Sequence, residues 1–435
     1  MVHAAVPIAR VSFFALSTLI LAGTRPFVAG NIQTVAMDSG GTGLEASLYL
    51  AATSLCIGAS LLTKGQSFRA TGLIPIALVL CYCGVSLAWS VSLVHAAPRF
   101  AQVTLVTFAL FIFMVKTPPL VVLNLAAAAF AVVMFADLAS VLAVQNAIHH
   151  SAALDENLIG AWKGVHIHKN YAGAVAAAGA LIFYCRWKHR IGRYNLALMA
   201  LSLVFMIGTS SKTSILICIG LIPLLEFRAC LQGRLGRAGF LFLCTFLAVI
   251  LVLTLILNGP DIWSWLAASR YFSARTELWA ALAGYISHNP VFGSGYGSFW
   301  RTGIYSPILG LTDGWGIRTG QGHNGYLDTI VTLGVPGFLL TLFAFVVAPL
   351  LRLLLDRGKR NVFTDVSFVF VVFCLLHNLM ETSILNGNNP VYLILMVGIG
   401  LGLAASYQGS PDTHAARSRA WAGIESDDEP LAGRR

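Results

Sequence analysis

Long apolar stretches separated by short polar segments recur along most of the chain. A helix that crosses a bilayer needs roughly 20 consecutive apolar residues, and twelve stretches come close to that length. The pattern therefore predicts an all-α polytopic membrane protein with about twelve transmembrane helices. The predicted spans are 7–23, 46–63, 71–94, 99–115, 119–145, 170–185, 194–210, 213–228, 238–258, 333–352, 365–383 and 388–405.

The composition favours the same class. The chain is 57% hydrophobic and 11% charged, whereas a soluble domain carries about 25% charged residues. The first apolar run follows Arg10 and resembles a signal peptide, but the many later spans favour a retained first helix. We predict a membrane domain over 1–407 and a disordered cytoplasmic tail over 408–435.

Lysine and arginine residues are distributed unevenly between alternate loops. One set of short loops carries 14 of them, whereas the other set carries nine over much longer loops. The positive-inside rule places the first set, and with it both termini, in the cytoplasm. The net charge of +10 follows from these loops and the tail, so nucleic-acid binding is not indicated. None of the eight cysteines falls in an outward loop, so no disulfide framework is expected.

Two outward loops are long, about 146–169 and 259–325. Both carry Trp, Gly and charged residues, and the larger is also rich in Tyr. Loops of this length are often functional. Within the larger loop, apolar residues at helical spacing predict a helix from Arg275 to His288 with Ser273 as its N-cap.

Arg275 falls in the first turn of that helix, where a cation opposes the helix dipole. The guanidinium and the N-terminal amides can together bind a phosphate. Alternatively, Arg275 pairs with Asp261 or Glu277, or faces water.

A Pro- and Gly-rich segment, 290–297, follows the predicted helix. Pro290 ends the helix, and the glycines allow a tight turn with close backbone approach. No strand precedes the segment, so its GxGxG spacing is not a nucleotide-binding fingerprint. We expect a turn that folds the loop back over the membrane surface.

His323 ends the long loop and begins the block His323-Asn324-Gly325-Tyr326-Leu327, which leads into a membrane helix. At a helix N-terminus the dipole disfavours the protonated imidazole. A neutral imidazole can act as a general base. A histidine that only caps the helix or forms a hydrogen bond is an equally good interpretation from position alone.

Other polar residues lie near the outward ends of spans. Lys212 occupies a tight outward hairpin, where it can snorkel to the surface or bind an anionic headgroup. Lys169 and Asn170 end the shorter outward loop. His166 and His168 lack a third ligand at a telling spacing, so a zinc site is not indicated.

Ionisable residues within predicted spans are functional candidates by default. Asp137, His377 and Glu381 lie near outward ends, and the i, i+4 spacing of His377 and Glu381 allows them to pair. No DxD motif occurs in the chain, so a divalent cation bridging a diphosphate has no obvious carboxylate ligands.

Taken in order, these segments resemble the O-antigen ligase / O-antigen polymerase family of bacterial membrane glycosyltransferases. The matching pieces are spread over 160–340, and the first half of the chain shares only the topology. They are Gly164 to Asn170, the Ser-Ser-Lys-Thr hairpin around Lys212, the run from Ser273 through Pro290 to Gly297, and the His323 block followed by Gly334 and Gly337.

The resemblance implies an inner-membrane enzyme of lipopolysaccharide biosynthesis whose outward loop is periplasmic. It implies inverting transfer of a glycan from undecaprenyl pyrophosphate, without a metal or another cofactor. By this resemblance Arg275 holds the pyrophosphate and His323 activates the acceptor hydroxyl. Lys212 stands where the family commonly has Arg, which removes the bidentate fork. The expected substrate-binding residues are Lys212, Lys169, Asn170, Arg318, Asn324 and Tyr326.

Members of the family differ in their acceptor, which is lipid A–core, another lipid-linked glycan or a protein hydroxyl. The single long loop directly before His323 favours a ligase that acts on lipid A–core, with a polymerase as the alternative. A transporter or lipid flippase would belong to a different class. Its paired halves with broken helices are not evident in the sequence. The expected partners are the lipid-linked glycan, lipid A–core and membrane lipids.

Overall fold

The fold is described from a computed structural model of the chain. It covers residues 2–27, 43–65, 67–150, 158–230, 273–312, 319–355 and 360–408, with the single positions 236, 239 and 264. The α-helices are α1 (Val2–Ala22), α3 (Gly43–Leu61), α4 (Ile74–Ser86), α5 (Leu93–Lys116), α6 (Pro119–Ala143), α7 (Lys169–Lys188), α8 (Asn195–Gly208), α9 (Lys212–Cys230), α11 (Ser273–His288), α13 (Gly325–Leu342), α14 (Ala348–Leu355), α15 (Val362–His377) and α16 (Pro390–Gln408). A π-helical turn, η7 (Phe343–Val347), joins α13 to α14, and short 3₁₀ turns include η1 (Ala70–Leu73), η2 (Leu87–Trp89) and η3 (Gln145–Ala147).

The predicted all-α class is confirmed. A helix coincides with each predicted span except 238–258, which lies outside the described residues. Within the described ranges, seven helices are long and apolar enough to cross a membrane, and α8 and α15 are shorter apolar helices. The span count of twelve and the placement of the long loop relative to the membrane remain predictions.

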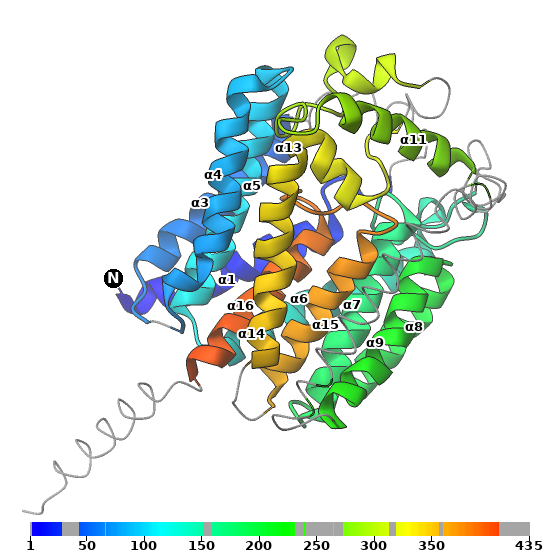
Figure 1. Cartoon of the computed structure of the whole chain (residues 1–435). Helices are drawn as coiled ribbons and strands as arrows, with labels where there is room; N and C mark the ends of the chain where they lie inside the picture. The colour runs from blue at the N-terminus through cyan, green and yellow to red at the C-terminus, as the bar shows by residue number, and fades with distance from the viewer. Residues whose placement is uncertain are drawn as a thin grey trace, which may run out of the picture.

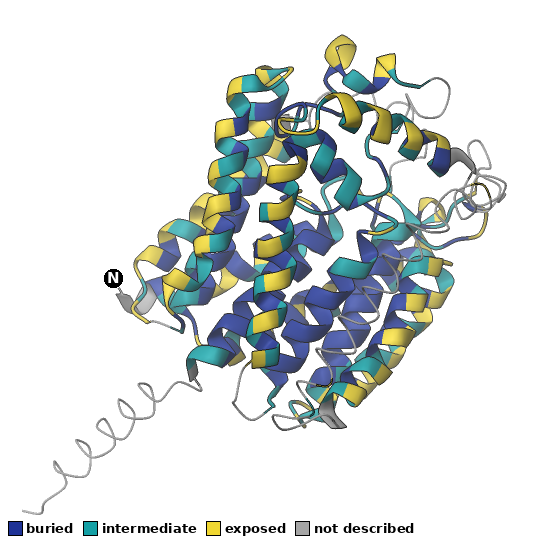
Figure 2. Ribbon diagram, viewed as in Figure 1, coloured by how far each residue is buried: buried dark blue, intermediate teal, exposed yellow. Residues whose placement is uncertain are grey.

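Helix α7 lies at the centre of the bundle and packs against α6, α8, α9, α15 and α16. Its residues from Ala172 to Phe183 are all buried, and most of them are Ala or Gly. Small side chains let neighbouring helices approach closely, and the Ser202 hydroxyl of α8 lies directly over Gly179. Figure 2 shows α7 and α15 dark blue along most of their length, whereas α4 and α8 carry exposed residues on their outer faces.

A break at Gly334 divides α13 into two helical segments. Gly334 has φ 68° and ψ 178°, and a Cβ at this position would lie 2.0 Å from the carbonyl oxygen of Val291. The 290–297 turn fits into the break, because Ser294 N–H donates to the Val331 carbonyl and Val335 N–H donates to that of Pro290. The close backbone approach predicted for this Gly-rich turn is therefore present.

Helix α11 and the segment that follows it form a small hydrophobic core with α13. Leu278 and Leu282 of α11 are buried with Phe299, Ile308 and Val331. Figure 1 shows α11 lying across the end of the bundle where α13 begins. The predicted apolar face of this helix is thus confirmed, although the helix begins at Ser273, so Ser273 belongs to its first turn and does not precede it.

The two ends of α15 carry buried carboxylates with different partners. Asp365, in the first turn, accepts hydrogen bonds from His189 at 2.8 Å and from Arg360 at 2.6 Å, and Arg228 lies 3.5 Å away. Glu381 follows the other end of the helix. The 16 residues of α15 span about 24 Å, so the two carboxylates mark opposite ends of the bundle.

Candidate active site

The buried carboxylate of Glu381 joins four chain segments at one end of the bundle. Its Oε1 accepts hydrogen bonds from Asn170 Nδ2 at 2.7 Å and Arg275 Nη2 at 3.2 Å. Its Oε2 accepts from His323 Nδ1 at 3.2 Å and Gln321 Nε2 at 3.3 Å. We call these five residues the Glu381 cluster. It brings together three residues predicted for the site, namely Asn170, Arg275 and His323.

The Glu381 carboxyl is ionised in this setting. Burial raises its pKa, but the hydrogen bond and charge of His323 and the charge of Arg275 outweigh burial and hold the pKa at about 2. The carboxylate can therefore offset the charge of a cation, or of an imidazolium that forms during a reaction.

His323 occupies the position immediately before the N-cap of α13, in a left-handed backbone conformation with φ 49°. Residues other than glycine rarely adopt this region, and a protein holds them there only when surrounding contacts compensate. Those contacts are present: Gly325 N–H donates to the carbonyls of Asn378 and Glu381 at 2.8 and 3.1 Å. The imidazole is thus fixed by its own backbone and by the carboxylate.

Asp328 positions the loop segment that carries His323. Its carboxylate accepts hydrogen bonds from Gly322 N–H at 2.9 Å and Trp300 Nε1 at 2.9 Å, and a third from the Thr382 hydroxyl. Trp279 Nε1 in turn donates to the Gly322 carbonyl at 2.8 Å. Gly322 is therefore held through both of its backbone groups, directly before the histidine.

Arg275 lies in the first turn of α11, as predicted, but its partner differs from those considered. It pairs with Glu381 and donates through Nη1 to the Met380 carbonyl at 2.8 Å. Asp261, one of the partners considered as an alternative, lies outside the described residues, and no ion pair joins Arg275 to Glu277 in the described part of the chain. Arg275, which the sequence suggests as a phosphate ligand, thus binds the same Glu381 carboxylate as His323.

The first turn of α7 forms another wall of the site. The His168 side chain caps the helix by accepting a hydrogen bond from Asn170 N–H at 3.2 Å. Burial, together with the charges of His149, His323 and Lys169, lowers the pKa of His168 to about 4 in spite of Glu381. His168 is consequently neutral near pH 7, beside the carboxylate cluster.

The other expected site residues have varied settings. Lys212 begins α9 with an exposed side chain, and the preceding Ser211 packs on Gly173 in the first turns of α7. Lys169 begins α7. Arg318 lies outside the described residues.

Asn324 and Tyr326 have structural contacts. Asn324 Oδ1 caps α13 by accepting from the N–H groups of Tyr326 and Leu327, both at 3.1 Å. The Tyr326 hydroxyl donates to the Leu375 carbonyl at 2.6 Å. Substrate binding by Asn324, Tyr326, Lys169 and Lys212 remains a prediction.

The structure corrects one expected pairing of ionisable residues and supplies the partners of another such residue, Asp137. Among the described residues no side-chain hydrogen bond joins Glu381 to His377, although Glu381 N–H donates to the His377 carbonyl at 3.0 Å. The Glu381 carboxylate faces Arg275 and His323. His377 stacks on Phe373 instead, with ring centroids 5.6 Å apart. Asp137 accepts hydrogen bonds from Val165 N–H at 2.9 Å and His166 Nε2 at 3.2 Å, so His166 serves to hold the shorter outward loop.

Arg301, which no motif in the sequence singles out, has its guanidinium close to the segment that precedes His323. It lies against Gly320, where a Cβ would be 1.9 Å from Arg301 Nε. Its backbone has φ 53°, and its carbonyl accepts a hydrogen bond from Arg99 at 3.0 Å. A cation in this position adds to the positive charge around the Glu381 cluster.

Fold and site together define a polytopic helical membrane protein with a histidine–carboxylate–arginine cluster at one end of its bundle. Residues 197–342 match the model of the family described as O-antigen ligase. This match confirms the family resemblance seen in the sequence, and it points to a membrane glycosyltransferase of the ligase or polymerase type. The matched range contains Lys212, Arg275 and His323, but Asn170 and Glu381 lie outside it. No curated protein matches the chain.

Proposed function

We propose that the protein is an O-antigen ligase. It transfers a glycan from undecaprenyl pyrophosphate to a sugar hydroxyl of lipid A–core, with inversion and without a metal. The observation that carries the proposal is the shared carboxylate: Glu381 binds His323 through one oxygen and Arg275 through the other. The Glu381 carboxylate thereby positions both the proton acceptor, His323, and the cation, Arg275.

His323 supplies the base. When Nδ1–H donates to Glu381, the imidazole is held in the tautomer whose lone pair is on Nε2, the nitrogen that accepts a proton. Proton transfer from the acceptor hydroxyl to Nε2 produces an imidazolium, which the neighbouring Glu381 carboxylate stabilises. The hydroxyl oxygen attacks the anomeric carbon of the donor as the bond to the diphosphate breaks, so the configuration inverts.

Positive charge at the same end of the bundle favours the diphosphate leaving group. Arg275 lies in the first turn of α11, and α7, α9 and α13 also begin at this end. Helix N-termini present unpaired N–H groups and a partial positive charge to anions. Arg275 and Lys212 can offset the charge that grows on the leaving phosphate. In this arrangement Glu381 neutralises Arg275 until the donor binds.

The remaining parts of the proposal concern the membrane. The basic residues around Asp365 lie at the end of α15 opposite Glu381. If these face the cytoplasm of a bacterial inner membrane, the Glu381 cluster faces the periplasm and both termini are cytoplasmic. A lipid-linked donor reaches this site from the outer leaflet.

The test is transfer by the purified protein in liposomes that contain a polyprenyl-diphosphate-linked glycan and rough lipopolysaccharide, with no added divalent cation. A glycan-extended lipid A–core product supports the ligase. Longer lipid-linked chains in its place would identify a polymerase, and a failure to form any covalent product would refute an enzyme of either kind. His323→Ala serves as the matched inactive control.

A further inference from the structure

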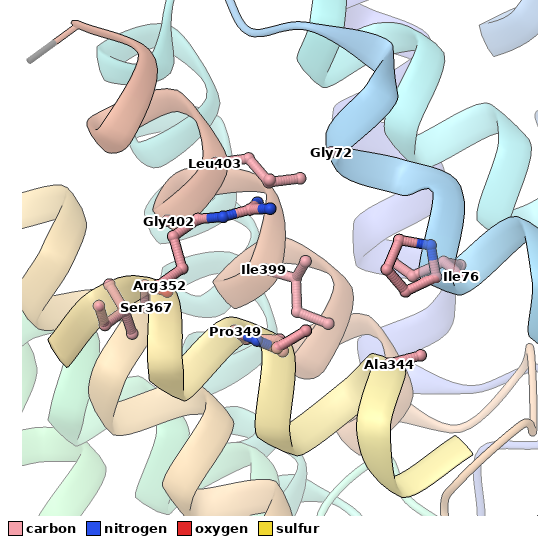
Figure 3. A pocket seen from close by; sticks show the side chains of 12 residues that line it. Gly72, Ile76, Ala344, Pro349, Arg352, Ser367, Ile399, Gly402 and Leu403 are labelled. Atoms are coloured by element: carbon pink, nitrogen blue, oxygen red, sulfur yellow. The ribbon is translucent and has the colours of Figure 1, made fainter. Parts of the chain in front are cut away.

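A second polar feature lies at the end of the bundle opposite the Glu381 cluster. Here a cleft is lined by η1 and α4 on one side and by η7, α14, α15 and α16 on the other. It encloses about 360 Å³, including the space at its open side. Figure 3 shows the Arg352 side chain reaching from α14 toward Leu403 of α16, with Gly72 across the cleft.

The Arg352 guanidinium is half-buried and has no hydrogen bond or ion pair to the described residues. Other arginines at this end are satisfied by protein acceptors. Arg360 and Arg228 bind Asp365, and Arg186 donates to the side chains of Asn195 and Asn124. A charged group removed from water without an acceptor is costly. The half-buried Arg352 guanidinium therefore favours binding of an anion from outside the protein.

Ser367 is a second polar residue of the cleft. It lines the cleft from α15, its side chain is 1% exposed, and its Oγ has no hydrogen-bond partner within the described ranges. Buried hydroxyl groups are normally satisfied. The unsatisfied hydroxyl packs against Gly402 and adds a polar group to the same cleft lining as Arg352.

The size of the cleft and its surroundings indicate what kind of molecule carries the anion. The cleft is narrow, because a Cβ added at Gly72 would lie 2.6 Å from Leu403 Cδ2 and 3.4 Å from Arg352 Nη1. It therefore suits a phosphate oxygen but not an acyl chain. Outside the cleft, Ile74, Leu351 and Leu355 are 53%, 40% and 65% exposed. An acyl chain can lie along these side chains while the phosphate faces Arg352.

We propose that this cleft binds the phosphate of an anionic phospholipid from the leaflet at the Asp365 end of the bundle. Basic pockets between helices on the cytoplasmic side of membrane proteins bind such headgroups. Arg352 lies near one end of the candidate membrane span Gly325–Leu355, and the other end of this span follows His323. The lipid would therefore anchor the far end of the helix that carries the proposed base.

The test measures lipid retention and does not depend on glycosyl transfer. Full-length protein in mixed micelles is titrated with phosphatidylglycerol or phosphatidylcholine, and bound lipid is counted by native mass spectrometry. We expect preferential retention of phosphatidylglycerol. Arg352→Gln should weaken it about tenfold, the factor that corresponds to one charge-assisted hydrogen bond. Inorganic phosphate at the same concentration should not displace the lipid, because it lacks the acyl chain.

Two further variants make the result specific. Arg352→Lys keeps the charge and should retain most of the binding, which shows that the protein still folds. Arg190→Gln removes an exposed arginine of the same predicted side and should leave retention unchanged. Equal losses in Arg352→Gln and Arg190→Gln, or no loss in either, would overturn the proposal, as would displacement by phosphate alone.

Discussion

His323 and Glu381 lie 58 residues apart in the sequence, and a hydrogen bond of 3.2 Å joins the imidazole Nδ1 to the carboxylate. His323 precedes α13 and Glu381 follows α15, so the bond ties two helix ends together. Because Arg275 binds the other oxygen of the same carboxylate, a change at Glu381 affects the proposed base and the proposed phosphate ligand at once.

Replacing the imidazole tests the proposed base. His323→Ala should lower the rate of glycan transfer by about 10²–10⁴-fold, the usual contribution of general-base catalysis. The measurement is the initial rate of product formation in liposomes at saturating donor. His288→Ala is the matched control, because His288 is an exposed histidine of the same outward loop, at the end of α11. Comparable rates for the His323 variant and the wild type would exclude His323 as the base.

The depressed pKa of Glu381 predicts a pH-dependent contribution to stability. Its folded-state pKa of about 2 lies below the ordinary value of 4.5, so its stabilisation is complete above pH 4.5 and is lost as the pH falls toward 2. Glu381→Gln should therefore be less stable than the wild type at pH 7, by about 3 kcal/mol as for other broken buried ion pairs.

That difference should narrow below pH 4.5, because the Glu381 carboxyl of the unfolded wild type takes up a proton there, whereas that of the folded protein does so only near pH 2. Unfolding in detergent micelles, followed at pH 7, 4 and 3, measures the narrowing. A difference that is the same at all three pH values would show that Glu381 is not held ionised by its partners.

The break in α13 predicts a marked cost for adding one methyl group. Gly334→Ala would place Cβ 2.0 Å from the Val291 carbonyl oxygen at φ 68°, so the 290–297 turn or the helix must move. We expect a loss of stability of about 2 kcal/mol or more and slower transfer. Gly284→Ala is the control, since nothing lies within 4 Å of its Cβ position on α11. Thermal unfolding of both variants provides the comparison, and equal midpoints would contradict this account of the break.

The sequence was sufficient to predict the helical class and most helix positions, because apolar periodicity and length are local properties. It also predicted α11 and its buried face, since Leu278 and Leu282 repeat at helical spacing. The central position of α7 was not evident, because an Ala- and Gly-rich helix has only moderate hydropathy. Its role depends on which helices pack around it.

The site was predictable only where a residue is unusual for its local position. Arg275 opposes a helix dipole and His323 ends a polar loop, and both belong to the Glu381 cluster. Glu381 was singled out, but with His377 as its partner, because the end of α15 could not be located to within one turn. Asp328 gave no signal, since an acidic residue in the first turn of a helix is already favourable. Its bonds to Gly322 and Trp300 exist only in the folded loop.

The short contact between Asn170 and Glu381 allows the charge of the cluster to be tested directly. Asn170 Nδ2 donates to Glu381 Oε1 at 2.7 Å, so Asn170→Asp places two carboxyl groups together. Two carboxylates that share a site cannot both ionise readily, and the pair should retain one proton at a raised pKa. Helix α7 should still form, because an acidic residue in its first turn is favourable.

With that proton bound, the introduced carboxyl group can donate to Glu381 as the Asn170 amide does. Transfer by Asn170→Asp should therefore fall about tenfold at pH 8, where the extra proton is lost, with each pH unit above the raised pKa reducing the active fraction about tenfold. Activity should recover as the pH is lowered, so the pH optimum moves to the acid side. Asn146→Asp adds the same charge at an exposed position of η3 and should keep the wild-type profile. Identical pH profiles for the two variants would show that the cluster does not govern transfer.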